Sequence, residues 1–219
     1  RYLKHCHEIC RMGRKLLLTS TGHDSLLAYD LDEKAFTWGF HLQKIADEWS
    51  GFTFDPRRDS GPAKHNEHHI NMVHVDSNGI FLSGLRTNAL LHLTHDHKVQ
   101  VVCSLPAGTH NARPYRDGVI FNDTVSDHVR FVSRERGQRS FKIKHYASDE
   151  IHFAGIDDSK IARQAFGRGL CVYEDRLLIG GSSPSTISLY DIVSGDTIGS
   201  VNMAMDIRNA IHGLELWPY

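Results

Sequence analysis

The sequence predicts an all-β protein made of one repeated structural unit. Four segments of equal length align without a gap, and in each an apolar run leads into small or polar residues around a turn former. Apolar residues at alternate positions follow. The four segments are 16–30, 80–94, 119–133 and 177–191. Alternation at period two is typical of strands, so each segment predicts strand, turn, strand, and no stretch gives a convincing helical pattern.

Each repeat is extended by a leading strand before it and a closing strand after it. The expected leading strands start at residues 7, 71, 110 and 168, and the closing strands cover about 36–42, 98–105, 140–145 and 197–203. A further leading strand starts at His212. Four-stranded units in tandem are typical of a β-propeller. We therefore expect four complete antiparallel blades plus the first strand of a fifth, from a five-bladed propeller or a fragment of a larger one.

The expected organisation is a single propeller domain over residues 1–219. Its blades would cover about 7–42, 69–106, 110–146 and 166–203, with a partial blade at 210–219. The first six residues are too few to supply the missing strands of a fifth blade, so we expect further sequence to complete the ring. Residues 43–68 break the repeated strand pattern. They contain Pro56, a Gly61-Pro62 pair and several charged residues, which predicts a long inserted surface loop.

The amino-acid composition gives no indication of two classes of binding partner, nucleic acid and membranes. The net charge is −1 at neutral pH and the isoelectric point is about 7.0, which gives no basis for binding nucleic acid or an anionic membrane surface. No apolar run approaches the roughly 20 residues that span a bilayer. The four cysteines are scattered, so we expect reduced thiols and a cytoplasmic location. The 16 histidines are the unusual feature, because imidazole serves as a metal ligand or an acid–base group.

The leading strands share a polar position whose neighbour two residues later is apolar. The leading strand of a propeller blade borders the central axis, so these positions would gather in a ring at one mouth of the channel. They are His7, Asn71, His110, Arg168 and His212. His5 and His69 lie two residues before His7 and Asn71 and would form a second layer. A register slip of two would bring His69 into the ring in place of Asn71.

Several imidazoles that converge on one axis predict a divalent metal site. The expected ligands are His7, His69, His110 and His212, and iron, zinc, manganese or copper would suit them. Arg168 is predicted to hold an anionic substrate group. Glu8 and Glu215, which adjoin two of the ligands or lie near them, are candidates to orient a ligand or act as a general base. The alternative for the same pattern is a structural ring of polar residues that hydrogen-bond neighbouring blades.

The repeat VDSNGIFLSGLRTNALLHLT at 75–94 resembles blades of the broad superfamily of NHL-repeat, SMP-30/gluconolactonase and strictosidine-synthase-like propellers. The resemblance implies a propeller fold. Gluconolactonase-like members hold their metal with acidic and amide side chains, whereas this chain offers chiefly histidine, so lactonase chemistry does not carry over. In arrangement alone, a histidine-lined axis is similar to that of the carotenoid-cleaving oxygenases.

Two functions remain open from the sequence. The first is a metal-dependent enzyme that acts on a small anionic or polar substrate, with hydrolase, lyase and oxygenase chemistry unresolved. The second is a non-catalytic propeller that binds a glycan, peptide or protein partner through its loop face, with residues 43–68 as the contact. The expected partner is therefore a small-molecule substrate or a surface-bound ligand, and neither nucleic acid nor a membrane.

Overall fold

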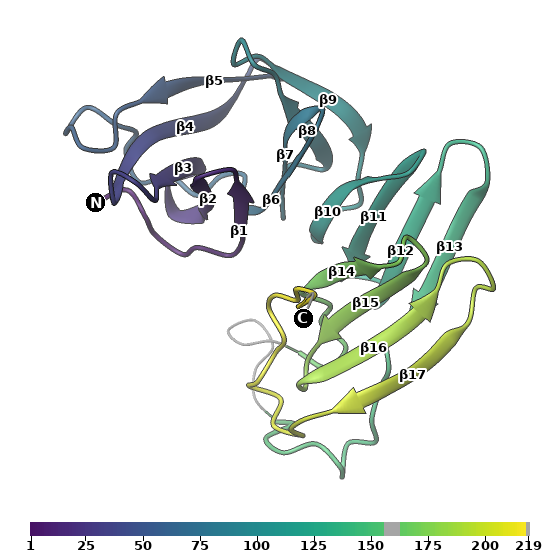
Figure 1. The fold of residues 1–219 in the computed structure, drawn as a ribbon. Coiled ribbons are helices and arrows are strands. Elements are labelled where there is room, and N and C mark those ends of the chain that lie inside the picture. The colour runs from purple at the N-terminus through teal and green to yellow at the C-terminus, as the bar shows by residue number, and fades with distance from the viewer. Residues whose placement is uncertain (156–162, 218–219) are drawn as a thin grey trace. The chain divides into compact units, whose positions relative to one another are not determined.

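The computed structural model describes residues 1–155 and 163–217, and these residues form antiparallel sheets with one short 3-10 helix (Figure 1). One sheet has five strands and three have four, and within each sheet the strands are neighbours in sequence order. The predicted all-β fold with four repeated antiparallel blades is confirmed. Within the described part of the chain, no helix has the length and apolar character required to cross a membrane.

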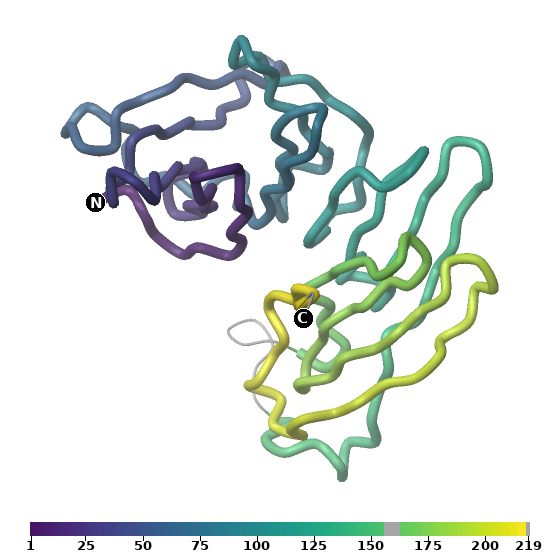
Figure 2. Tube along the Cα trace, in the orientation of Figure 1, coloured from purple at the N-terminus to yellow at the C-terminus, as the bar shows by residue number. Residues whose placement is uncertain are grey.

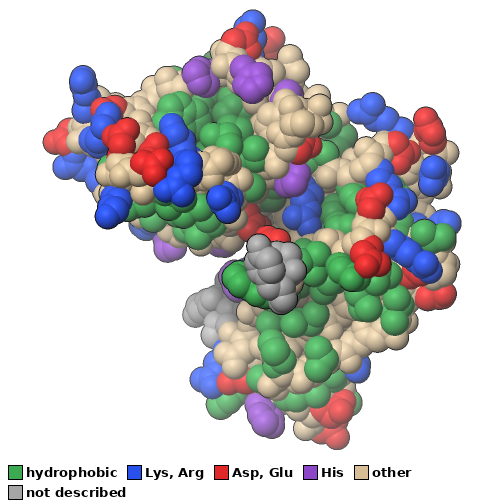
Figure 3. Space-filling model, viewed as in Figure 1, with side chains coloured by type: hydrophobic (Ala, Val, Ile, Leu, Met, Phe, Trp, Pro, Cys, Tyr) green, Lys and Arg blue, Asp and Glu red, His purple; other side chains and the backbone are tan. Residues whose placement is uncertain are grey.

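The chain divides into two compact units, residues 1–113 and residues 114–219. The boundary falls inside strand β10 (Thr109–Tyr115). Figure 2 follows the chain through the sheets in sequence order. On the face seen in Figure 3, basic and acidic side chains are interspersed on each unit and do not gather into a patch of one sign.

The first sheet of unit 1 is larger than the sequence indicated. Its strands are β1 (Ile9–Met12), β2 (Lys15–Ser20), β3 (Ser25–Asp30), β4 (Ala35–Ile45) and β5 (Glu48–Phe54). The prediction of a loop over 43–68 is therefore wrong for its first half, which contains the end of β4 and all of β5. Ala46 and Asp47 join these strands with φ values of 48° and 69°, so both residues of a two-residue hairpin turn are left-handed.

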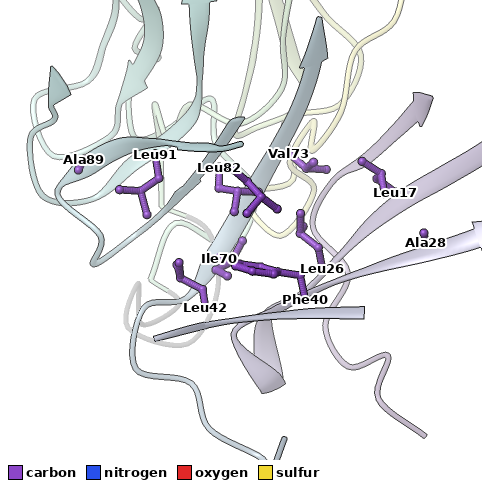
Figure 4. Packing of buried hydrophobic residues seen from close by; sticks show 11 residues of the cluster. Leu17, Leu26, Ala28, Phe40, Leu42, Ile70, Val73, Leu82, Ala89 and Leu91 are labelled. Atoms are coloured by element: carbon purple, nitrogen blue, oxygen red, sulfur yellow. The ribbon is translucent and has the colours of Figure 1, made fainter. Parts of the chain in front are cut away.

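The second sheet of unit 1 packs against the first. Its strands are β6 (Ile70–Asp76), β7 (Gly79–Gly84), β8 (Ala89–Leu93) and β9 (Val99–Ser104). Apolar side chains from both sheets meet in one core (Figure 4), where removing each large side chain from water contributes roughly 1.5–3 kcal/mol. The core consists of Leu17, Leu26, Ala28, Phe40, Leu42, Ile70, Val73, Leu82, Ala89, Leu91 and Leu93.

The third and fourth sheets pack in the same way within unit 2. The third comprises β10, β11 (Gly118–Asp123), β12 (His128–Ser133) and β13 (Gly137–Lys142), and the fourth comprises β14 (Leu170–Tyr173), β15 (Leu177–Ser182), β16 (Thr186–Asp191) and β17 (Thr197–Asn202). The core of unit 2 includes Ile120, Phe131, Phe141, Leu178 and Tyr190. Each unit therefore buries apolar side chains between a pair of blades.

The turn former of each repeat fixes the closing strand. Asp24, Asn88 and Asp127 have left-handed φ values of 42°, 50° and 58°, a conformation that Asn and Asp tolerate better than most residues. The carbonyl oxygen of each accepts a backbone hydrogen bond from a residue in the closing strand or directly after it, and Ser185 does so in the fourth repeat. The bonds are Leu42 to Asp24 (2.9 Å), Leu105 to Asn88 (2.9 Å), Ile143 to Asp127 (2.8 Å) and Met203 to Ser185 (2.9 Å).

The fourth leading strand is one residue out of the register that the sequence alignment assumed. The equivalent strand pairs are Ile9–Leu18, Val73–Leu82 and Cys171–Ile179. Gly169, and not Arg168, therefore matches His7 and Asn71. The cause is the β14–β15 turn, where Tyr173 pairs with Leu177 across residues 174–176, one residue more than in the first two sheets. Successive residues of an extended chain point to opposite sides, so Arg168 leaves the predicted ring position.

The predicted fifth leading strand does not form in the described residues. Residues 210–217 have no strand assignment, and residues 218 and 219 lie outside the described part. Residues 209–211 dock on the fourth sheet, because the Ser185 amide donates to Asn209 O (2.9 Å) and the Ile211 amide donates to Ser182 O (3.4 Å) at the end of β15. These bonds hold the segment against the sheet, but residues 210–217 have no strand assignment.

Asp24 also anchors the segment that leads into the second sheet of unit 1. Its side chain is fully buried, and its carboxylate accepts hydrogen bonds from three consecutive backbone amides. The donors are the amides of Glu67 (2.6 Å), His68 (3.1 Å) and His69 (2.9 Å). One side chain therefore satisfies three backbone donors that would otherwise need other partners.

We expect Asp24→Ala to lower the free energy of unfolding by about 3 kcal/mol, because buried amide donors lose a charged acceptor. Asp24→Asn should cost about 1 kcal/mol, since asparagine keeps one acceptor oxygen and tolerates the left-handed turn. Urea unfolding of both variants measures the difference. Equal losses in the two variants would show that the carboxylate has no special role.

Candidate functional site

Three of the predicted metal ligands lie in unit 1, near the start of its leading strands. His7 comes just before β1, His69 just before β6, and His110 is the second residue of β10. The rings of His7 and His69 are adjacent, with centroids 5.2 Å apart and planes inclined by 51°. The His110 side chain is 6% exposed. The structure thus brings His69, rather than Asn71, beside His7.

The hydrogen bonds around His7 determine which ring nitrogen carries its proton when the ring is neutral. Nδ1 lies 2.7 Å from Thr21 Oγ1 and 3.1 Å from the His5 carbonyl. The Thr21 hydroxyl donates its only proton to Ile70 O, 2.5 Å away, so it must accept from His7. Nδ1 therefore carries the proton, and the lone pair of neutral His7 is on Nε2.

His69 and His110 adopt the same tautomer for the same kind of reason. His69 Nδ1 is 3.1 Å from Asn66 Oδ1, an oxygen that also accepts from the Arg86 guanidinium. His110 Nδ1 is 3.1 Å from the carbonyl of Gly108. Both acceptors lack a proton to give, so Nδ1 donates and the lone pair is on Nε2. Three imidazoles thus share the tautomer that suits metal ligation through Nε2.

Glu8 is held in place by two other strands of the same unit. Its carboxylate Oε2 accepts a hydrogen bond from Asn111 Nδ2 at 3.1 Å, and its backbone amide donates to Thr19 Oγ1 at 3.0 Å. Asn111 adjoins His110 and has a left-handed φ of 54°. The Glu8–Asn111 bond shows that the starts of β1 and β10 lie close together, which is what the axial placement of leading strands predicts.

The predicted ligands do not form a complete metal centre as their side chains stand. Among residues 1–155 and 163–217, no group of three or more His, Cys, Asp or Glu side chains is arranged to hold a metal ion. The His5 side chain is exposed, and the residue contacts the site through its carbonyl oxygen, which accepts a hydrogen bond from His7 Nδ1. Asn71 is buried and donates from Nδ2 to Thr109 O at 3.3 Å, so it links β6 to β10.

The remaining predicted residues lie in unit 2, where Arg168 and His212 pair with each other. Arg168 Nη1 is 2.7 Å from His212 Nε2, and the guanidinium lies 4.4 Å from the ring centroid of Phe166. Arg168 Nε is buried without a hydrogen-bond partner among the described residues. Burial lowers the pKa of this guanidinium, which still stays charged near neutral pH. Glu215 is exposed, and its carboxylate accepts a hydrogen bond from the next backbone amide, that of Leu216, at 3.2 Å.

Sequence reasoning did not identify Thr21 or Asn111 as parts of this site. Thr21 belongs to the 3-10 helix Thr21–His23 after β2, and its hydroxyl links His7 to the backbone of β6. A single threonine in a turn carries no signal for such a role. For Asn111 the only signal was its place beside His110, because the left-handed φ that directs its side chain is not visible in the sequence.

No protein-family model and no curated protein sequence matches the chain, but solved β-propeller structures do. A catalytically inactive virginiamycin B lyase from Staphylococcus aureus with quinupristin aligns at a TM-score of 0.52 and 9% identity, covering 90% of this chain. The WD40 β-propeller domain of Doa1 aligns at 0.56 and 10%, covering 91% of this chain and 70% of that one. A luciferin-regenerating enzyme aligns at 0.51 and 12%, covering 95% and 78% respectively.

These likenesses show the fold alone, because all of the identities are far below those that carry function. The matched structures include two enzymes and a WD40 domain, so they support the propeller fold without placing the chain in the NHL/SMP-30-like superfamily that its repeat resembles. The chain spans 55% of the length of the lyase with quinupristin.

We expect nitrogen-15 NMR spectra of the histidine rings to show protonated Nδ1 for His7, His69 and His110 at mildly alkaline pH. Free histidine prefers the opposite tautomer, so the three signals should stand apart from those of exposed residues such as His95. Thr21→Val should remove one acceptor and shift only the His7 signals. Protonated Nε2 on all three rings would contradict the hydrogen-bond assignment.

Proposed function

We propose that this chain is part of a metal-dependent β-propeller enzyme that acts on a small polar or anionic substrate. The observation that carries the proposal is the shared tautomer of His7, His69 and His110, which directs three Nε2 lone pairs away from their Nδ1 acceptors. Support also comes from the lyase relative, which is catalytically inactive when one histidine is replaced by alanine.

His7 and His69 would provide the first two ligands, because their rings already lie 5.2 Å apart between centroids. His110 would complete the set after its side chain rearranges, since its neighbour Asn111 bonds Glu8 beside His7. Oxygen acceptors on each Nδ1 fix ring orientation and raise the basicity of Nε2, as is usual around metal-bound histidine. The bound ion, whether iron, zinc, manganese or copper, would act as a Lewis acid or lower the pKa of a bound water.

Glu8 is the proposed general base. Its backbone amide bond to Thr19 and its carboxylate bond to Asn111 fix the side chain next to the proposed ligand His7. One carboxylate oxygen accepts from the asparagine amide, and a carboxylate has enough lone pairs to take a proton as well. Glu215, the other sequence candidate, has no comparable support among the described residues, where its carboxylate accepts from the adjacent backbone amide.

Arg168 is the proposed anion-binding residue of unit 2. It combines a charged guanidinium, a hydrophobic platform from Phe166 and a second donor–acceptor partner in His212. Among the described residues it forms no ion pair with a carboxylate, although burying a cation without a counter-ion is costly. A carboxylate, sulfate or phosphate would supply that charge.

Metal analysis of the untagged protein is the direct test. We expect a single divalent ion per chain, with its loss in the variant His7→Ala/His69→Ala and at least tenfold weaker binding in Thr21→Val, where a ligand loses its supporting acceptor. Elemental analysis after dialysis against the candidate metals measures both.

The matched control is His95→Ala/His97→Ala, which removes two histidines of the β8–β9 turn in the same unit and should leave metal content unchanged. A parent protein without metal under reducing, metal-supplemented conditions would refute the enzyme proposal. Equal losses in both double variants would show non-specific binding to a histidine-rich surface.

Anion binding at Arg168 can be measured separately from metal. We expect sulfate or phosphate to raise the stability of the protein by about 2.7 kcal/mol at a hundredfold excess over the dissociation constant. Arg168→Gln should abolish this response. Arg176→Gln is the control, because Arg176 already pairs with Asp191 at 3.0 Å. Thermal unfolding over a series of anion concentrations gives the result, and an identical response in Arg168→Gln would exclude this site.

A further inference from the structure

A pocket of about 440 Å³ lies in unit 1 between the β4–β5 hairpin and the turn that joins β7 to β8. None of the proposed metal ligands lines it, and half of its lining residues come from the stretch that the sequence predicted as a loop. The lining includes Lys44, Asp47, Trp49, Glu67, His68, Arg86 and Val101. Its volume lies within the range of small-molecule sites, and its position on a rigid hairpin gives it a defined shape.

The wall of the pocket is an indole fixed by two neighbours. The Trp49 ring meets the His68 ring edge to face, with centroids 4.9 Å apart and planes at 67°, and Lys44 Nζ lies 5.6 Å from the Trp49 centroid. Trp49 is half-buried and packs against the core of unit 1. The indole held in this way lines a pocket whose other walls include charged and polar side chains.

His68 is the second observation that points to a ligand. Its side chain is 5% exposed and lines the pocket, yet neither ring nitrogen has a hydrogen-bond partner among the described residues. Its backbone is fixed by the bond to the Asp24 carboxylate. As a neutral ring, this imidazole offers the pocket one donor and one acceptor. A hydroxyl group, which also donates and accepts, matches that pair.

The charges around the pocket are balanced, which selects an uncharged ligand. Lys44 pairs with Asp47 at 3.0 Å, and the Glu67 carboxylate lies 2.9 Å from His65 Nε2. The Arg86 guanidinium donates to the backbone oxygens of Asn66 and Glu67. Two cations and two carboxylates thus line the pocket with several donors and acceptors and no excess of either sign.

We propose that this pocket binds a neutral saccharide, with a pyranose ring against Trp49 and a hydroxyl group hydrogen-bonded to His68. Sugars combine an apolar face of C–H groups with hydroxyl groups around the rim, and the pocket offers the complementary indole and mixed polar groups. The site would give the chain a carbohydrate-binding function independent of any metal.

The test is saturation-transfer NMR and titration calorimetry on the whole chain, with a chelator present so that the proposed metal site cannot contribute. The probes are maltose, lactose, cellobiose and N,N′-diacetylchitobiose, with glucuronate as the charged comparison. We expect saturable binding of at least one neutral disaccharide. Trp49→Ala and His68→Phe should each weaken binding at least tenfold, because one removes the stacking surface and the other removes the donor and acceptor.

Val101→Arg keeps the proposal falsifiable if a core-facing variant unfolds. Val101 is 56% exposed, so the protein should fold, while the longer side chain should block the pocket and abolish binding. Trp38→Phe, at the other partly buried indole of unit 1, is the matched control and should bind normally. No binding by any neutral sugar, binding of glucuronate alone, or unchanged affinity in Val101→Arg would each overturn the proposal.

Discussion

The carboxylate of Asp24 is the interaction on which the functional features of unit 1 depend. It is buried, it lies in a left-handed turn, and it accepts from the amides of three consecutive residues. Fixing this tripeptide fixes two side chains with opposite environments. His69 reaches the ring of His7, and His68 reaches the ring of Trp49. One buried carboxylate therefore holds both the proposed metal ligand and the proposed saccharide contact, because it accepts from the backbone amides of both residues.

Hydrogen-bond acceptors on Nδ1 determine the tautomers of the three histidines in unit 1, whereas their closeness to one another does not. Thr21 shows this most clearly, because its hydroxyl proton goes to Ile70 O and its oxygen is left to accept from His7. The same bond joins the turn after β2 to the start of β6, so the tautomer of His7 depends on correct docking of the two blades. A hydroxyl that both donates and accepts sets the direction of a short chain of bonds. Loss of this docking would release the His7 ring even with every histidine in place.

The repeat, the strand order and the polar starts of the leading strands follow from the sequence because period-two patterning reports which side of a strand is buried. Strand β5 was not predicted from the sequence, although Trp49, Phe52 and Phe54 favour a strand. Its hairpin turn uses Ala46 and Asp47 in left-handed conformations where Asn-Gly would be the usual signal. The register of Arg168 was not predicted for a similar reason. One extra residue in the β14–β15 turn moves the leading strand by one position and leaves its apolar pattern intact.

The repeated fold determines where the candidate sites can lie, but the side chains that form them differ between the repeats. The turn position occupied by Asp24 recurs as Asp127, with the same left-handed backbone and the same carbonyl bond to a closing strand. The Asp127 side chain, however, meets Arg163 at 2.6 Å and His145 at 3.1 Å instead of a run of backbone amides. The repeated backbone bond therefore stabilises both blades in the same way. The partners of the aspartate side chain, in contrast, differ from one blade to the other. In unit 1 the Asp24 carboxylate fixes the backbone that places the His68 imidazole in the wall of a pocket. In unit 2 the Asp127 carboxylate instead contacts the Arg163 guanidinium and the His145 ring.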